Sequence, residues 1–217
     1  MKSRYVVVAL VLFTSSLLYS QEITTNPKYA LSFGISENFR LNKFIMDISG
    51  KKIIDESHQL RLFLAPRISS KLEEVETSGT TQSQDIESLN YSLGVGADYL
   101  WILIKNEDIN MFGGTGLIIT YGFNNSKSTS NGPNNEKSVN ELNNQLISAG
   151  IRGTVGVEWM VSNKIGIHSE YIFTGSYNYN DSENKFSLNG TANPTNTRTS
   201  NGILLDSVVL FGVSIYF

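Results

Sequence analysis

Cysteine is absent from this chain of 217 residues, and proline is scarce, with four residues. Without cysteine there is no disulfide framework, no cysteine-ligated metal, no thiol nucleophile and no lipid anchor on a thiol. Charged residues make up 17% of the chain, whereas about 25% is usual in soluble domains. The formal net charge of −3 gives no indication of nucleic-acid binding. The length suits one domain.

The sequence also lacks hydrophobic runs long enough to span a membrane as a helix. Its most conspicuous apolar run lies near the start. Residues 1–20 carry two cations, an apolar stretch at 5–13 that is too short to span a bilayer as a helix, and then small residues. This order predicts a signal peptide cleaved after Ser20. A short lead at 21–28 and one domain at 29–217 would follow. No other stretch approaches 18 apolar residues, so we expect either a soluble exported protein or a transmembrane β-barrel.

The rest of the sequence has apolar residues at alternate positions rather than with a helical period. The alternation is clearest at 203–217, where one face carries isoleucine, leucine, valine and phenylalanine. Alternation of this kind predicts strands whose two faces differ in polarity. We predict eight strands, of which the second is the least regular, at 29–36, 44–54, 59–73, 87–103, 109–123, 145–161, 165–179 and 203–217.

The connections between these strands differ in length. Short connections are expected at 55–58, 104–108 and 162–164, and long polar loops at 74–86, 124–144 and 180–202, with 37–43 as a brief exception. Alternating short turns and long loops, with an even strand number, are typical of outer-membrane barrels. The fold class predicted is therefore all-β, an eight-stranded antiparallel up-and-down transmembrane β-barrel. Both termini would then be periplasmic and the long loops extracellular.

The polar faces of the strands carry glycine, serine, threonine and most of the strand charges, including Asp47, Lys71 and Glu73. An arginine or lysine facing hydrocarbon costs about 2–4 kcal/mol at the bilayer midplane, so this face should line the lumen. Eight strands leave an interior only wide enough for side chains. We predict a lumen charge network of Lys51, Arg61, Arg67, Asp98, Arg152, Glu158, Glu170 and Asp206, with Arg67, Arg152 and Asp206 farther from the periplasmic end.

Two soluble alternatives share the alternation. A lipocalin-type barrel has an apolar lumen and a polar exterior, and a two-sheet sandwich buries its apolar faces between the sheets. The charged face, which fits inside, argues against the lipocalin-type barrel, and the sandwich does not account for the aromatic residues at the strand ends. Those near the short turns are Tyr99, Trp101, Trp159 and Phe217, and those near the long loops are Tyr91, Tyr121, Phe123, Tyr177 and Tyr179. Two aromatic rings around an apolar band are the girdles expected of a membrane barrel.

Three segments carry a resemblance to a family. The last strand, with Phe211, Val213, Ile215 and Phe217, resembles the signature that the bacterial barrel-assembly machinery recognises. GVEWMVSNKIGIHSEY (156–171) and ENFRLNKF (37–44) resemble hairpins of small OmpA-like and opacity-type outer-membrane barrels. The resemblance covers about 28–217, and it implies insertion into outer-membrane lipid by that machinery. The peptidoglycan-binding domain of full-length OmpA has no counterpart here, so we expect no peptidoglycan anchor.

Candidates for chemistry are few. Some small barrels resemble lipid A acyltransferases or deacylases, which need a histidine near the outer rim, but His58 and His168 are both expected at the periplasmic end. Two histidines without a nearby partner do not suggest a metal site. GGTG (113–116) lacks the lysine of a phosphate loop. The acidic residues Glu73, Glu74 and Glu76 could bind calcium at the surface, but the simpler interpretation is the solvent-exposed edge of a loop.

These observations lead to three hypotheses of function. The first is a non-enzymatic integral outer-membrane barrel without a cofactor, whose exposed end has a structural or environment-contacting role. The second is a narrow channel for small solutes, which requires an unplugged lumen. The third, a lipid-modifying enzyme, is the least supported by the positions of the histidines.

Overall fold

A computed structural model describes residues 27–36, 43–76, 83–132 and 136–217. The predicted signal peptide at 1–20, almost all of the lead at 21–28 and the greater part of the 37–43 connection lie outside these residues. The described residues form nine strands, which are β1 (Tyr29–Ser36), β2 (Lys43–Ile53), β3 (His58–Glu76), β4 (Ser83–Lys105), β5 (Ile109–Asn131), β6 (Lys137–Ser162), β7 (Ile165–Leu188), β8 (Thr191–Ala192) and β9 (Asn196–Tyr216). Within the described ranges, no helix is long and apolar enough to cross a membrane.

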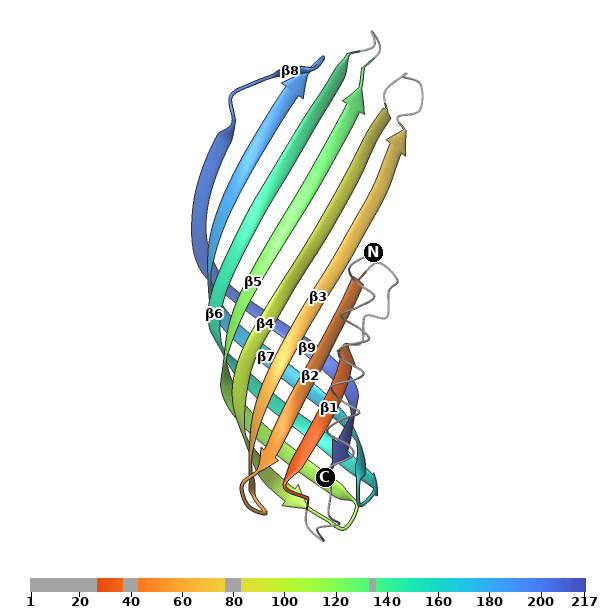
Figure 1. Cartoon of the computed structure of the whole chain (residues 1–217), viewed down its shortest axis with the longest axis vertical. Helices are drawn as coiled ribbons and strands as arrows, with labels where there is room; N and C mark the ends of the chain where they lie inside the picture. The colour runs from red at the N-terminus through yellow and green to blue at the C-terminus, as the bar shows by residue number, and fades with distance from the viewer. Residues whose placement is uncertain (1–26, 37–42, 77–82, 133–135) are drawn as a thin grey trace.

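Eight of the described strands form a closed antiparallel ring (Figure 1). In the ring, each strand from β1 to β6 pairs with the next one, β7 pairs with β9, and β9 pairs with β1. Gly34 of β1 thus lies opposite Gly212 of β9. The two-residue strand β8 pairs with the end of β7 in the connection to β9. The eight-stranded barrel is therefore confirmed, and the two-sheet sandwich is wrong. The second strand, least regular in sequence, pairs on both sides as β2.

The strands are longer than the sequence pattern predicted. The predicted long loops at 74–86, 124–144 and 180–202 are wrong, because β3 to β9 continue through most of these residues. In the β5–β6 hairpin, pairing extends to Asn131 opposite Lys137. The apolar alternation ends where these strands leave the apolar band, but backbone pairing requires no apolar side chains. The polar residues predicted to form loops therefore belong to strands, which extend the barrel beyond its apolar band.

The wall is not equally tall all round. We call the end with the connections at 54–57, 106–108 and 163–164 the turn end, and the opposite end the far end. β1 ends at Ser36, opposite Leu210, and β2 begins at Lys43, opposite Ser69. Beyond these points residues 70–76 of β3 and 196–209 of β9 have no strand partner on that side within the described chain. Among the described residues, the ring of paired strands is therefore closed in the turn half and interrupted between β3 and β9 in the far half (Figure 1).

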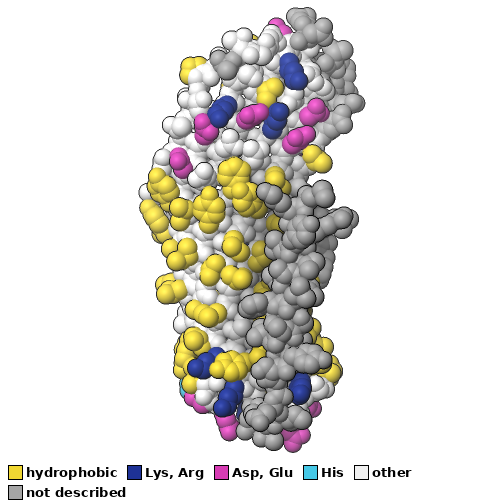
Figure 2. All heavy atoms as spheres, in the orientation of Figure 1, with side chains coloured by type: hydrophobic (Ala, Val, Ile, Leu, Met, Phe, Trp, Pro, Cys, Tyr) yellow, Lys and Arg dark blue, Asp and Glu magenta, His cyan; other side chains and the backbone are white. Residues whose placement is uncertain are grey.

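The outer surface carries an apolar band around the closed half. Figure 2 shows apolar side chains over the middle of the molecule and charged side chains toward both ends. The exposed apolar residues of the band include Leu62, Leu64, Leu93, Val95, Leu117, Ile119, Ile151, Val155, Tyr171 and Phe173. Trp101 and Trp159 are exposed toward the turn end, and Tyr91, Tyr121 and Tyr177 toward the far end. The predicted aromatic rings thus bracket an apolar exterior, as membrane barrels require.

Candidate functional site

Arg61 is the centre of the turn half of the lumen. Its guanidinium is fully buried and donates to Asp98 Oδ2 from Nε at 3.0 Å and from Nη2 at 2.6 Å. Across the lumen, Nη1 donates to both carboxylate oxygens of Glu170, at 2.8 and 2.7 Å. Strands β3, β4 and β7 supply these three residues. Such a buried cation is tolerated because two carboxylates compensate it.

Arg152 extends this cluster. Its Nη1 donates to Asp47 Oδ2 at 3.2 Å, and its Nε lies 3.5 Å from Asp98 Oδ2. The guanidinium carbon lies 3.9 Å from the centroid of the Phe63 ring, a cation–π distance. The expectation that Arg152 lies farther up with Arg67 and Asp206 is wrong. Asp47 belongs to the cluster although the predicted network omitted it.

A second group of buried polar residues lies beside the first. Lys51 Nζ is 3.6 Å from Glu158 Oε1, and the Tyr216 hydroxyl donates to Glu158 Oε2 at 2.5 Å. Lys51 also donates to Ser214 Oγ at 3.3 Å. Sequence reasoning did not assign Tyr216 and Ser214 to the network, although both lie on the lumen face of the last strand.

His168 joins the two groups, since its Nδ1 lies 3.2 Å from Ser214 Oγ and its Nε2 lies 3.7 Å from Glu170 Oε1. We define the charge cluster by its buried ionisable residues, which are Asp47, Lys51, Arg61, Asp98, Arg152, Glu158, His168 and Glu170. The predicted residues Lys51, Arg61, Asp98, Arg152, Glu158 and Glu170 are all brought together here.

Buried apolar side chains fill the space around the charge cluster. Phe63 and Phe112 are each 2% exposed, and Leu100 is also buried. The Phe63 ring lies against Gly96 and the Phe112 ring against Gly156, where a Cβ atom would collide with the ring. Glycine on the neighbouring strand thus makes room for an aromatic ring. Together, rings and ion pairs fill the lumen of the turn half.

Arg67 and Asp206 form a separate ion pair in the far half. Arg67 Nη1 donates to Asp206 Oδ2 at 3.3 Å, and their side chains are 40% and 47% exposed. The two residues were predicted in one network with the others, but the structure places them apart from the charge cluster. Such an exposed pair contributes little to stability.

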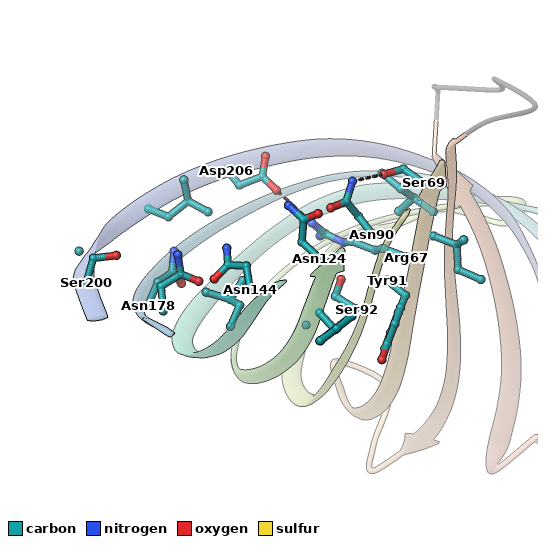
Figure 3. A pocket seen from close by; sticks show the side chains of 18 of the residues that line it. Arg67, Ser69, Asn90, Tyr91, Ser92, Asn124, Asn144, Asn178, Ser200 and Asp206 are labelled. Atoms are coloured by element: carbon teal, nitrogen blue, oxygen red, sulfur yellow. Dashed lines mark hydrogen bonds and ion pairs between the residues drawn. The ribbon is translucent and has the colours of Figure 1, made fainter. Parts of the chain in front are cut away.

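A cavity of about 650 Å³ opens above the filled part of the lumen. Its lining includes Asn90, Asn124, Asn144, Asn178 and Asn180, one or two from each of β4 to β7. Figure 3 shows the first four following one another along the curved wall. We call this cavity the asparagine cleft. Asn90 and Asn178 lie within predicted strands, but Asn124, Asn144 and Asn180 lie in segments that were predicted to be loops, so the sequence pattern did not bring the five together.

The remaining predicted residues have local roles. His58 begins β3 rather than lying in the turn, and its Nδ1 lies 2.9 Å from Asp55 Oδ1. The pKa of Asp55 is lowered by the hydrogen bond from the Ser57 backbone and by that with His58. Glu73 belongs to β3 and pairs with Lys71 instead of forming a loop edge. In the described ranges, no group of three metal-ligating side chains could hold an ion.

The predicted assembly residues lie on the outer side of β9 and at the closure of the ring. Phe211 and Val213 are exposed on the apolar band, and Ile215 pairs with Leu31 of β1. Phe217 donates its backbone N–H to Tyr29 and accepts from Tyr29 and Lys28. The first and last strands are therefore joined at the turn end.

Comparisons with known proteins agree at the level of the fold. No protein-family model matches the chain, and no curated protein matches it. The outer membrane protein OprG from Pseudomonas aeruginosa is 12% identical, with 88% of this chain and 96% of that chain aligned and a TM-score of 0.53.

Two other solved structures are less similar in shape. Ail, the attachment invasion locus protein of Yersinia pestis, is 11% identical over 87% of this chain and 92% of that chain, with a TM-score of 0.39. CarO of Acinetobacter baumannii is 12% identical over 91% of this chain and 100% of that chain, with a TM-score of 0.38. The ring of strands and the likeness to OprG together show that this chain has the fold of the small eight-stranded outer-membrane β-barrel proteins.

Proposed function

We propose that this chain is a non-enzymatic integral protein of the outer membrane of a Gram-negative-type bacterium. Its turn end faces the periplasm, and its far end projects outside. The apolar band between two aromatic rings carries this proposal, because such an exterior is stable in lipid and unfavourable in water. Insertion by the barrel-assembly machinery is part of the proposal, with the outward side chains of β9 as the recognised strand.

The orientation is supported by the difference between the two ends. The connections at the turn end are short, whereas strands at the far end extend well past the apolar band. Their outer faces there carry ion pairs such as Lys127 with Glu141, at 3.7 Å, and Lys185 with Glu183, at 3.3 Å. Charged pairs of this kind suit an aqueous environment. Short periplasmic turns and longer extracellular parts are the usual arrangement.

The lumen supports a closed barrel rather than a channel. The charge cluster and the rings of Phe63 and Phe112 occupy the turn half, and all of these residues are buried. A conducting pore would need mobile water where these paired charges lie. The far end of the barrel, and not transport through it, is therefore the part that meets the environment.

An enzymatic role has less support. His58 lies at the turn end and His168 is buried within the charge cluster. In the proposed orientation, neither histidine reaches a substrate in the outer leaflet.

Fractionation and protease digestion of intact cells test this proposal. The protein should co-sediment with outer membranes and migrate differently on gels with and without boiling, because a closed barrel keeps its backbone hydrogen bonds internal. A protease cleavage site inserted between Asn131 and Lys137 should be cut when protease is added to intact cells, and a cleavage site inserted at 106–108 should not. Recovery in the soluble periplasm, or the reverse cleavage pattern, would overturn the assignment.

A further inference from the structure

The asparagine cleft has the features of a binding site for an uncharged ligand rich in hydroxyl groups. Its volume of about 650 Å³ lies within the range of about 300–1,000 Å³ usual for small-ligand sites. The wall is built of paired strands, so its side chains are held more firmly than they would be on loops. Within the described residues, no strand closes the ring between β3 and β9 beside the cleft.

The asparagines form an ordered array across the wall. Asn90 lies opposite Asn124 in the β4–β5 pair, and Asn124 lies opposite Asn144 in the β5–β6 pair. Neighbouring strands are about 4.8 Å apart, so the array presents amide donors and acceptors at regular short intervals. An amide offers both donors and an acceptor, which matches the two roles of a hydroxyl group.

This array has unused hydrogen-bonding capacity. The Oδ1 atoms of Asn124 and Asn180 are buried and accept no hydrogen bond from the described residues. Asn90 Nδ2 has long contacts of 3.3 Å to Ser69 Oγ (Figure 3) and 3.4 Å to Ser88 Oγ. A buried polar group without a partner is unfavourable, so a ligand toward which these amide side chains rotate would gain a hydrogen bond from each of them.

The charges of the cleft select against ionic ligands. Arg67 and Asp206 are the charged residues of its lining, and they neutralise each other at 3.3 Å. The lining also includes apolar residues, with Leu146 beside Asn144 on β6, Ile45 on β2, and Leu204 and Val208 on β9. A sugar ring combines an apolar C–H face with hydroxyl edges, so one amphipathic ligand class suits a lining in which amides and apolar side chains are mixed.

We propose that the asparagine cleft binds a neutral oligosaccharide. This inference rests on the proposed outward orientation of the far end for its biological meaning, but binding by the purified barrel does not depend on orientation. Failure of one is therefore distinguishable from failure of the other. The same chemistry could come from polysaccharide outside the cell or from the cell's own surface oligosaccharide, and the experiment includes both sources.

The test is calorimetric titration of the full barrel in a detergent without a sugar headgroup. Probes are maltohexaose, chitohexaose, lipid-free surface oligosaccharide from the producing bacterium, and a heparin hexasaccharide as the acidic comparison. We expect saturable binding of at least one neutral probe and weaker binding of the acidic one. Which neutral probe binds identifies the source.

Two double variants localise the binding. Asn124→Ala with Asn144→Ala removes inward amides, and should weaken binding about tenfold or more, since each amide makes hydrogen bonds to the ligand. Asn125→Ala with Asn143→Ala removes an adjacent pair on the other face, where Asn125 Nδ2 donates to Asn143 Oδ1 at 2.6 Å. This control should leave affinity unchanged. Heat-modifiable migration establishes that each variant is folded.

Three results would overturn the proposal. They are the absence of saturable binding for every neutral probe, an equal loss in both double variants, and tighter binding of the acidic hexasaccharide than of any neutral one. Weaker binding confined to the inward variant supports it.

Discussion

The turn half and the far half of the lumen are formed by the same strands, yet their inward side chains differ in kind and in burial. In the turn half, Arg61, Asp98 and Glu170 are each 2% exposed or less and are joined by ion pairs. In the far half, Arg67 and Asp206 are nearly half exposed, and amides replace most charges. The comparison indicates that one half holds the barrel together and the other presents groups to solvent.

The exterior changes at a corresponding place. Around the turn half the outward residues are leucine, isoleucine, valine and aromatics, and on β4 and β5 they become polar beyond Leu89 and Phe123. Lipid imposes apolar side chains outside and self-contained polar groups inside. Where the strands rise above lipid, both faces can be polar.

The largest expected difference between the halves concerns their arginines. Arg61→Ala leaves the buried Glu170 without its arginine and Asp98 with only the 3.5 Å contact to Arg152, and should cost about 3–5 kcal/mol of unfolding free energy. Arg67→Ala removes an exposed ion pair and should cost about 0–1 kcal/mol. Urea unfolding in lipid vesicles measures both. Similar losses for the two variants would contradict the difference in burial.

The boundary of the apolar band can be tested with lysine on the outer face of β5. Leu117→Lys places a charge in the middle of the band and should cost about 2–4 kcal/mol. Asn125→Lys, on the same face beyond the aromatic ring, should be nearly neutral. Unfolding in vesicles separates the two positions. A cost at Asn125 equal to that at Leu117 would show that the band extends farther than we describe.

Close packing against the charge cluster predicts an intermediate effect. A Cβ atom at Gly116 would collide with the Ala97 carbonyl and the Asp98 carboxylate, so Gly116→Ala should cost about 1–3 kcal/mol through overpacking. At Gly153 the nearest atom to a Cβ is the Phe173 carbonyl oxygen at 4.0 Å. Gly153→Ala is therefore the control, and thermal unfolding should leave it near the parent protein. A stable Gly116→Ala variant would mean that the cluster is loosely packed.

The smallest effect is expected in the turn at 54–57. The pKa of Asp55 is lowered in the folded protein by hydrogen bonds from Ser57 and with His58. A carboxyl group whose pKa is lowered by folding stabilises the folded protein at pH values above its ordinary pKa. This contribution to stability is lost as the pH falls through the pKa of the folded state. Asp55→Asn should thus reduce the difference in unfolding midpoint between pH 7 and pH 3 slightly. Glu107→Gln, in the next turn, is the control and should leave that difference as it is.

The sequence predicted much of this fold because alternation reports directly which face of a strand is buried. It assigned Arg61, Asp98 and Glu170 to the lumen from their positions in the strands. It misplaced Arg152, because the height of a residue in a barrel depends on strand tilt and stagger, which alternation does not contain. It also ended the strands too early, since polar segments such as 124–131 pair through the backbone and carry no apolar signal. Ring closure at Phe217 and Tyr29 likewise depends on partners distant in sequence.

The central claim is that the turn half closes the lumen, and single-channel recording in planar bilayers tests it most directly. The refolded barrel should insert without producing a stable conductance, because paired charges and the rings of Phe63 and Phe112 occupy the path. Arg61→Ala, if it inserts, should produce more current than Arg67→Ala, since only the first variant opens the cluster. A stable open conductance in the parent protein would contradict the closed lumen and favour the channel.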